Sequence, residues 1–410
     1  MREAMALVLS GGGGDRLSVL TAERAVSAIP FGGKYRVIDF VLSNCCHSEI
    51  ERIGVLTQHA PQSLHDHIGS GRAWDLDRRD ARILILQPYL TREHSLWYRG
   101  TADAVARNWD VVEEARVQRV LVLPGDHVYK MDYRPLFESH AQHGAAVTLA
   151  VAPVPGSETN RFGMVTLDSD DRVRRLEEKP AASQSQTASM GIALFEVDAL
   201  ARALARPVVD LATDVLAPLI ESGTHVQAHR FAGYWEDVGT LRSYFQASMD
   251  LLRTEPSLLL DDPSWPILTR DEERPPVHVL PGAELEGSLV ANGCRVAGRV
   301  QRSILFPGVV VEEGAEVIDS VLMQDVHVEA GAKVERAIVD KLARVGRGAL
   351  VGAGGEAVEP TLVGKYAVTP PGARVGAGAV LGVGAGAADF HDAQISAGER
   401  VRDRLETAAP

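Results

Sequence analysis

The first apolar stretch of the chain ends in a run of glycines followed by an arginine. Met5 to Ser10 are predicted to form a strand, and the residues directly after it that could bind an anion are Gly11, Gly12, Gly13, Gly14 and Arg16. Glycines carry no Cβ, so their backbone N–H groups can close on an anion. The Arg16 guanidinium adds a permanent charge that fits phosphate oxygens. A phosphate-binding turn is therefore predicted, although a tight strand-to-helix turn can also use glycine for its conformation alone.

Two common phosphate loops do not fit this group. A P-loop ends in Gly-Lys-Ser/Thr, whereas Gly14 is followed by Asp15 and Arg16. The dinucleotide-binding fingerprint needs a third glycine where Arg16 stands, so Asp39 lacks the context of a ribose ligand. The turn is predicted to be a nucleotide loop of another kind.

The composition limits the partners of the chain. Its 410 residues carry a formal net charge of -13, which argues against nucleic acid because phosphate backbones need a basic face. A negative protein that handles phosphates must concentrate positive charge locally or use a metal ion. The three cysteines, Cys45, Cys46 and Cys294, have no paired spacing, which fits a reducing compartment and excludes a thiolate metal cluster. No signal peptide or membrane-spanning run is visible, so a cytoplasmic protein is expected.

Residues 1–254 alternate apolar runs with amphipathic stretches. Helices are expected at Asp103–Ala115 and Tyr133–His143, the second ended by Gly144. Strands are expected at Met5–Ser10, Arg52–Thr57, Val120–Pro124, Val147–Pro153 and Ala193–Glu196. This alternation predicts an α/β domain with a mostly parallel sheet and helices on both faces. Ligands on such sheets bind beyond the carboxyl ends of the strands, where the glycine turn lies.

The second half of the chain has a different rhythm. Residues 255–281 are rich in Pro and Asp and are predicted to be a connector. Over 282–388, and just before it, branched apolar residues recur in pairs six positions apart: Val279 and Leu285, Val290 and Val296, Ile304 and Val310, Val311 and Val317, Val328 and Val334, Val345 and Val351, Val375 and Leu381. Small residues follow many of them: Cys294, Ala315, Ala332, Ala349 and Ala379. This hexapeptide pattern predicts a left-handed parallel β-helix, followed by an uninformative tail at 389–410.

Several strings of residues together resemble one enzyme family. They are Phe31-Gly32-Gly33-Lys34-Tyr35-Arg36-Val37-Ile38-Asp39-Phe40, Leu42-Ser43-Asn44-Cys45, Trp97-Tyr98-Arg99-Gly100-Thr101-Ala102-Asp103-Ala104, Gly125-Asp126-His127-Val128-Tyr129-Lys130, Glu178-Lys179-Pro180, Ser189-Met190-Gly191 and Trp235-Glu236-Asp237-Val238-Gly239-Thr240. From residue 4 to about 350 the chain is similar to the glucose-1-phosphate adenylyltransferases, also called ADP-glucose pyrophosphorylases. The resemblance implies a Rossmann-like nucleotidyltransferase domain, a C-terminal β-helix and usually a homotetramer.

The reaction implied by the resemblance converts ATP and glucose 1-phosphate into ADP-glucose and pyrophosphate, for synthesis of glycogen-type glucans. A sugar phosphate oxygen attacks the α-phosphorus of ATP, so the protein must position two anions and neutralise developing charge. Mg²⁺ held by carboxylates does much of this. Asp126, after a predicted strand, matches the catalytic, metal-binding aspartate, and Asp237 matches the second metal carboxylate. Each could instead be a loop aspartate that caps a turn.

The resemblance also implies the residues that hold the two substrates. Lys179 matches the lysine for the sugar phosphate and Glu178 a contact to glucose hydroxyls, although both could form a surface ion pair. Tyr98, Gly163 and Ser189 match further glucose 1-phosphate contacts, and Tyr98 could equally be a core aromatic with a satisfied hydroxyl. Arg16 would hold the triphosphate. The residues expected to read adenine are Gln58 and Gln87.

The sequence departs from the family in the loop after Arg16. The family continues into Arg-Ala-Lys-Pro-Ala, whose lysine contacts the ATP phosphates, but here Val26 stands in the lysine position. Asp15 places a negative charge where threonine is common. One lost charged contact typically costs about 10²–10³ in rate. Lys34 or Lys130 could replace the charge; alternatively, the chain is a catalytically weak paralogue that regulates an active partner in a heterotetramer.

Other interpretations stay open. A related enzyme could use another nucleotide or sugar, and a β-helix can host an acyltransferase, although only His278 and His327 lie on its coils. His65 and His67 are expected to be solvated rather than metal ligands. Family activators bind basic residues near the domain interface, so allosteric regulation is expected without an identified effector.

Overall fold

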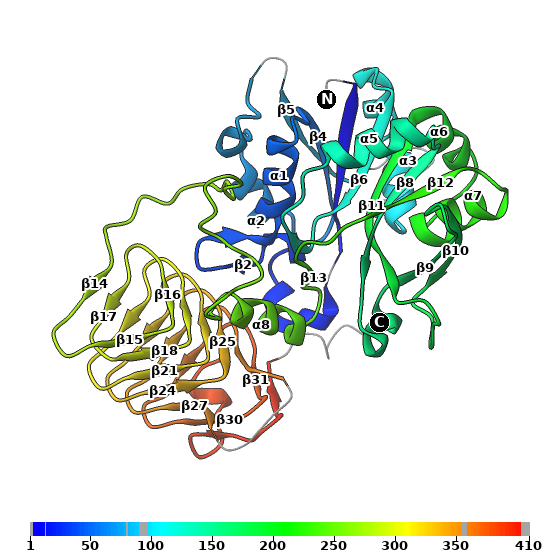
Figure 1. The fold of residues 1–410 in the computed structure, drawn as a ribbon. Coiled ribbons are helices and arrows are strands. Elements are labelled where there is room, and N and C mark those ends of the chain that lie inside the picture. The colour runs from blue at the N-terminus through cyan, green and yellow to red at the C-terminus, as the bar shows by residue number, and fades with distance from the viewer. Residues whose placement is uncertain (1–2, 13, 79–80, 90–96, 354–358, 403–410) are drawn as a thin grey trace. The chain divides into compact units, whose positions relative to one another are not determined.

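The computed structural model describes residues 3–12, 14–78, 81–89, 97–353 and 359–402. They form two compact units, each made of more than one segment (Figure 1). Residues 1–12, 40–61 and 65–235 make the first, here called the sheet unit. Residues 13–39, 62–64 and 236–410 make the second, here called the β-helix unit. The β-helix unit thus includes the segment that begins inside the glycine turn.

The sheet unit is built around one mixed sheet. Among the described residues its strands follow the order β10-β9-β11-β6-β1-β4-β5, with β8 beside β11 and β12 beside β8. The strands β1, β4, β5 and β6 are mutually parallel, whereas β11 runs antiparallel to β6, β8 and β9. Their bounds are β1 Ala4–Ser10, β4 Arg52–Thr57, β5 Arg82–Leu86, β6 Arg119–Pro124, β8 Val147–Pro153, β9 Gly163–Leu167, β10 Val173–Glu178, β11 Thr187–Glu196 and β12 Val226–Arg230.

Helices alternate with these strands, as the sequence predicts. They are α1 Val37–His47, α2 Gln62–Ile68, α3 Thr101–Arg107, α4 Trp109–Ala115, α5 Arg134–His143, α6 Val197–Leu204 and α7 Ala217–Glu221. The single helix expected at Asp103–Ala115 is interrupted at Asn108. The Asn108 side chain donates to the Ala104 carbonyl at 2.8 Å and to the Tyr98 hydroxyl at 2.9 Å, a local bonding that competes with a continuous helix.

The β-helix unit contains three stacks of short parallel strands (Figure 1). The first stack is β14 His278–Val279, β17 Arg295–Val296, β20 Val310–Val311, β23 His327–Val328, β26 Arg344–Val345 and β29 Val368–Thr369. The second is β15 Glu284–Glu286, β18 Arg299–Gln301, β21 Glu316–Ile318, β24 Lys333–Glu335, β27 Leu350–Ala353, β30 Arg374–Gly376 and β32 Gln394–Ile395. The third is β16 Leu289–Val290, β19 Ile304–Leu305, β22 Val321–Leu322, β25 Ala337–Val339, β28 Thr361–Val363, β31 Val380–Leu381 and β33 Arg400–Val401. The fold is consistent with the predicted left-handed β-helix.

Most of the hexapeptide residues form the interior of this β-helix. Val317, Val334 and Val351 stand in register on neighbouring strands and are buried. Val279 and Leu285 follow the same pattern but are 46% and 42% exposed. They lie on β14 and β15, the first strands of their stacks, so only one neighbouring coil covers them.

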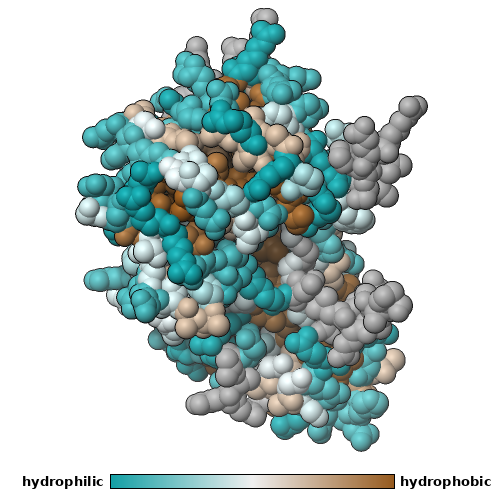
Figure 2. All heavy atoms as spheres, turned by 90° about the vertical axis from the view of Figure 1, so that its right-hand side faces the viewer, coloured by the Kyte–Doolittle hydropathy of each residue, from teal (hydrophilic) through white to brown (hydrophobic). Residues whose placement is uncertain are grey.

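Residues 255–277, most of the predicted connector, contain no helix or strand among the described residues. The unit also includes α8 Leu241–Asp250, and its last strands, β32 and β33, fall in the predicted tail. Hydrophilic residues dominate the face in Figure 2, where hydrophobic ones form separate small patches. None of the helices in the described part of the chain is long and apolar enough to cross a membrane.

Candidate active site

A close approach of two parallel strands places Asp126 beside the end of β1. The backbone N–H of Gly125 donates to the Leu9 carbonyl at 2.9 Å. A Cβ at Gly125 would collide with the Ser10 hydroxyl, so only glycine fits between the strands. Asp126 follows at the carboxyl end of β6, next to the strand that leads into Gly11 and Gly12, and its side chain is 42% exposed.

Three residues predicted to bind glucose 1-phosphate converge from three strands. Gly163 on β9 pairs with Glu178 on β10. A Cβ built on Gly163 would lie 2.9 Å from Glu178 Oε2 and 3.9 Å from the Ser189 Cβ on β11. Glycine at this position therefore keeps room beside a carboxylate and a hydroxyl. The sheet brings this predicted group together.

Lys179 directly follows Glu178 of this group in the chain. Its backbone has φ +43°, an uncommon conformation for a residue with a side chain, and its N–H donates to the Phe162 carbonyl at 3.1 Å. The Lys179 ammonium lies 3.2 Å from Glu178 Oε1 and is 58% exposed. The predicted surface ion pair thus forms, at the edge of the group that contains Gly163 and Ser189.

Gln58 is hydrogen-bonded to the backbone of Tyr98, in the loop that precedes α3. Its amide oxygen accepts the backbone N–H of Tyr98, and its amide nitrogen donates to the Tyr98 carbonyl at 3.3 Å. The Tyr98 ring belongs to the core, its hydroxyl accepts from Asn108, and burial raises its pKa. Both side chains are thus engaged within the protein: Tyr98 matches the core aromatic considered above, and Gln58 clamps the loop.

The same loop is held by a buried carboxylate that sequence reasoning gave no role. Asp103 accepts from the Arg99 backbone at 3.0 Å and pairs with the guanidinium groups of Arg99 and Arg107, each at 2.9 Å. Its side chain is only 8% exposed. The two arginines supply the positive partners that a buried carboxylate needs.

The two histidines expected to be solvated are not free surface residues, and for His67 that prediction is wrong. His67 is 7% exposed and packs edge-to-face on Trp74. His65 is half-buried and lies 3.0 Å from the amide nitrogen of Gln87, and its ring also lies 3.5 Å from the Thr57 hydroxyl. The amphipathic pattern of residues 62–68 was the available signal, because it places His67 on the buried side of α2.

The rest of the predicted nucleotide loop belongs to the β-helix unit; Gly13 lies outside the described residues. Gly14 has φ +65°, and its carbonyl accepts the Leu17 N–H at 2.8 Å and the Thr21 hydroxyl at 2.9 Å. A Cβ at Gly14 would collide with a methyl group of Val26, which is 6% exposed. Val26 therefore supports the turn by packing.

Arg16 and Asp237 approach the same glycine in the β-helix unit. A Cβ built on Gly239 would lie 2.8 Å from Asp237 Oδ1 and 3.3 Å from a terminal nitrogen of Arg16. Asp237 Oδ1 accepts the Gly239 N–H at 2.8 Å, and Thr240 then caps α8. The structure thus places the predicted triphosphate arginine near the predicted second metal carboxylate.

Comparison with known proteins identifies the family. The nucleotidyl transferase family matches residues 5–254, and the GlmU-like C-terminal hexapeptide family matches 281–379. The glucose-1-phosphate adenylyltransferase of Thermomicrobium roseum is 47% identical over 98% of both chains. The protein of the same name from Acetivibrio thermocellus is 37% identical over 99% of both, and that of Bacillus mycoides is 43% identical over 82% of this chain and 92% of its own.

The chain belongs to the glucose-1-phosphate adenylyltransferase family. The resemblance noted from the sequence strings is confirmed, and so is the predicted order of a nucleotidyltransferase domain and a hexapeptide β-helix.

The carboxylates of this family member fit Mg²⁺ by their chemistry. Mg²⁺ prefers oxygen ligands and usually takes one or two protein carboxylates, with water and substrate phosphates completing its shell. The described residues contain no group of three or more His, Cys, Asp or Glu side chains placed to hold a metal. Asp126 and Asp237 each offer carboxylate oxygens, the kind of ligand that Mg²⁺ prefers.

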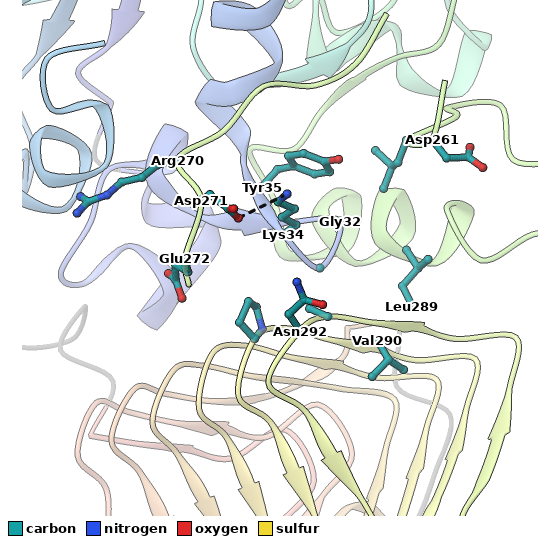
Figure 3. Close-up of a pocket in the computed structure, with 14 residues that line it drawn as sticks. Gly32, Lys34, Tyr35, Asp261, Arg270, Asp271, Glu272, Leu289, Val290 and Asn292 are labelled. Atoms are coloured by element: carbon teal, nitrogen blue, oxygen red, sulfur yellow. Dashed lines mark ion pairs between the residues drawn. The ribbon is translucent and has the colours of Figure 1, made fainter. Parts of the chain in front are cut away.

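A pocket of about 350 Å³ lies within the β-helix unit (Figure 3). It is lined by the Gly32–Tyr35 segment, by residues 270–272 of the connector and by residues 289–292 of the first coils. Lys34 Nζ lies 3.7 Å from Asp271 Oδ1, and both side chains are more than half exposed. Side chains of both charges line the pocket, among them Arg270 and Glu272, together with apolar residues such as Leu289 and Val290.

One buried cation, Arg24, and two half-buried ones, Arg36 and Lys341, lie in the same unit. Arg24 forms a buried ion pair with Asp340, with the closer oxygen at 2.7 Å. Burial, ahead of the effects of neighbouring charges, lowers the pKa of Arg36 to about 10 and that of Lys341 to about 7. Positive charges close to one another and partly removed from water favour an anion beside them.

Proposed function

We propose that this protein makes ADP-glucose and pyrophosphate from ATP and glucose 1-phosphate, in support of glycogen-type α-glucan synthesis. The observation that carries the proposal is the convergence of Gly163, Glu178 and Ser189, with Lys179 at their edge, in a chain 47% identical over almost its whole length to a protein named for this reaction.

The residues of this group have complementary tasks. The Lys179 ammonium would leave Glu178 for the sugar phosphate, and the carboxylate would then accept hydrogen bonds from glucose hydroxyls. Gly163 leaves room for the sugar and Ser189 supplies a hydroxyl beside it. Arg16 would bind the triphosphate, whose charge suits a guanidinium. Positioning of this kind lowers the activation barrier, because the two substrates lose their translational and rotational entropy on binding, before the reaction step.

Asp126 and Asp237 would hold Mg²⁺, which when bound neutralises phosphate charge in the reaction. Asp126 is suited to this by its exposure at the end of β6.

A regulatory paralogue without strong activity is the alternative that Val26 raises. Two observations favour a working enzyme. Val26 packs against the Gly14 turn and so keeps the loop in shape without adding charge. The other predicted functional side chains are all retained: Arg16, Asp126, Glu178, Lys179 and Asp237.

We also infer allosteric control by an anionic effector, a cytoplasmic location and assembly into a homotetramer, with a heterotetramer as the alternative. The pocket in Figure 3 and the cations Arg24, Arg36 and Lys341 support the first of these inferences.

Pyrophosphate release by the purified chain tests the proposed reaction. ATP with glucose 1-phosphate and Mg²⁺ is expected to be the preferred pair, and GTP, UTP or another sugar 1-phosphate should react far more slowly. Faster release with another nucleotide or sugar would identify a different pyrophosphorylase. Acetyl-CoA binding, expected to be absent, tests the acyltransferase alternative.

A further inference from the structure

A histidine and a tryptophan from two of the sequence strings that resemble the family, residues 125–130 and 235–240, contact each other. The indole nitrogen of Trp235 lies 3.1 Å from Nδ1 of His127. The two rings stand edge-to-face, with centroids 5.6 Å apart and planes at 73°. The His127 side chain is 12% exposed, so this contact is largely shielded from water. Both residues belong to the sheet unit.

This contact determines where His127 carries its proton. An indole N–H can only donate, so Nδ1 of His127 must accept and carries no hydrogen. The proton of the neutral ring is then on Nε2. Nε2 is the atom that faces Asp126, at 3.8 Å from Oδ1. The donor edge of the ring is therefore turned toward the carboxylate at the end of β6.

Trp235 is itself fixed by residues near the sugar-phosphate group. It packs on a small buried cluster formed by Val154, Phe162, Met164 and Ala188, and its ring lies 5.0 Å from that of Phe162. Phe162 directly precedes Gly163 and accepts the N–H of Lys179. The orientation of Trp235 thus depends on the segment that carries the predicted substrate residues.

We propose that His127 is a positioning residue for Asp126, held in its Nε2–H tautomer by Trp235. The N–H orients the Asp126 carboxylate and thereby sets how its oxygens meet a metal ion and the reacting phosphates. At 3.8 Å the contact is longer than a hydrogen bond, and such contacts commonly tighten only when substrate is bound. The proposal rests on the proposed function, because it assigns Asp126 to that reaction.

Two substitutions at His127 test the roles of its two ring nitrogens separately. His127→Gln keeps an amide N–H near the place of Nε2 but loses the acceptor for Trp235. His127→Asn keeps an oxygen near the place of Nδ1 but loses the donor toward Asp126. His127→Asn is expected to lower kcat about 10- to 100-fold with KM for glucose 1-phosphate nearly unchanged, and His127→Gln to retain clearly more activity. Equal losses in both variants would contradict the proposal.

Trp235→Phe removes the indole N–H but keeps an aromatic ring on Phe162. Long-range ¹H–¹⁵N spectra of histidine-labelled protein, assigned with His127→Gln, are expected to show a pure Nε2–H tautomer in the wild type and a mixture in Trp235→Phe. An Nδ1–H tautomer in the wild type, or no change in Trp235→Phe, would overturn the proposal. This readout needs no turnover, so it separates a failure of the positioning role from a failure of the proposed reaction.

Discussion

The coils of the β-helix unit and the predicted substrate group of the sheet unit depend on their small and apolar residues differently. In the β-helix, Val317, Val334 and Val351 occupy equivalent positions, and each packs as its neighbours do. In the sheet unit, a Cβ at Gly125 would meet the Ser10 hydroxyl and the Leu9 carbonyl oxygen, and one at Gly163 would meet the Glu178 carboxylate. A repeat shares its stabilisation among like residues, whereas a site depends on single contacts between residues distant in sequence.

This difference predicts separable effects of substitution. Changes in the β-helix should lower the free energy of unfolding and leave the kinetics of the folded enzyme nearly intact. Changes in the predicted site should alter the kinetics and leave the free energy of unfolding nearly unchanged, because partly exposed functional groups contribute little to the stability of the fold.

The largest effect is expected from Asp340→Ala in the β-helix unit. It leaves the buried Arg24 without its carboxylate and should lower the free energy of unfolding by about 3–5 kcal/mol. Urea unfolding followed by circular dichroism measures this loss. The control is Asp319→Ala, which removes an exposed partner of Arg302 and should cost no more than about 1 kcal/mol. Equal losses in the two variants would show that burial does not set the strength of the Arg24 pair.

Asp126→Asn should have the largest effect on turnover. Loss of the carboxylate charge is expected to lower kcat about 10²- to 10³-fold, because charge stabilisation acts in the transition state. Pyrophosphate release measures kcat, and thermal unfolding should be nearly unchanged. Asp110→Asn, at an exposed position on α4, serves as the control and should keep full activity. A fully active Asp126→Asn variant would remove Asp126 from the reaction.

Val317→Ala tests the repeat itself. Removal of two buried methyl groups should lower the free energy of unfolding by about 2 kcal/mol, since the stacked coils leave little room to collapse around the gap. Val368→Ala, at a position 44% exposed, should change it far less. A large change in kcat for Val317→Ala would mean that the β-helix and the reaction are not separable.

The smallest effect concerns pH. Because burial lowers the pKa of Lys341 to about 7, the ammonium is present below that pH and is lost as pH rises through it. Sulfate keeps its charge over this range. Its affinity for the cluster of Arg24, Arg36 and Lys341 should therefore fall as pH rises from 6 to 8, by up to about tenfold per unit above pH 7. Calorimetry in two buffers of different ionisation enthalpy should detect proton uptake on binding. Lys341→Met should abolish the pH dependence, whereas Lys333→Met, at an exposed ion pair, should retain it.

The sequence predicted the repeated β-helix better than it predicted the contacts of the sheet unit. Most of the hexapeptide interior could be predicted, because one environment is repeated along the chain; Val279 and Leu285, on the first strands of their stacks, are exposed instead. The strands β4 and β8 were also predicted with their correct bounds, since each is a continuous apolar run. The antiparallel direction of β11 depends on tertiary contacts that no local pattern encodes. The break at Asn108 depends on the bonds of one side chain to Ala104 and Tyr98, which the amphipathic pattern does not show.

The candidate site could be predicted as a set of strings but not as a set of contacts. The convergence of Gly163, Glu178 and Ser189 follows from strand pairing, which the strings do not specify. The burial of His67 was missed because its spacing from His65 was considered and its helix was not. The contact between His127 and Trp235 joins residues 108 positions apart in the chain.

Formation of ADP-glucose by the purified wild-type chain alone, compared with Val26→Lys, tests the proposed reaction directly. Product is separated by chromatography after incubation with ATP, glucose 1-phosphate and Mg²⁺. We predict that the wild type makes ADP-glucose without a partner subunit, because Val26 supports the Gly14 turn by packing and the other predicted functional residues are present. ADP-glucose formed only by Val26→Lys would contradict it and would identify the natural chain as a regulatory subunit.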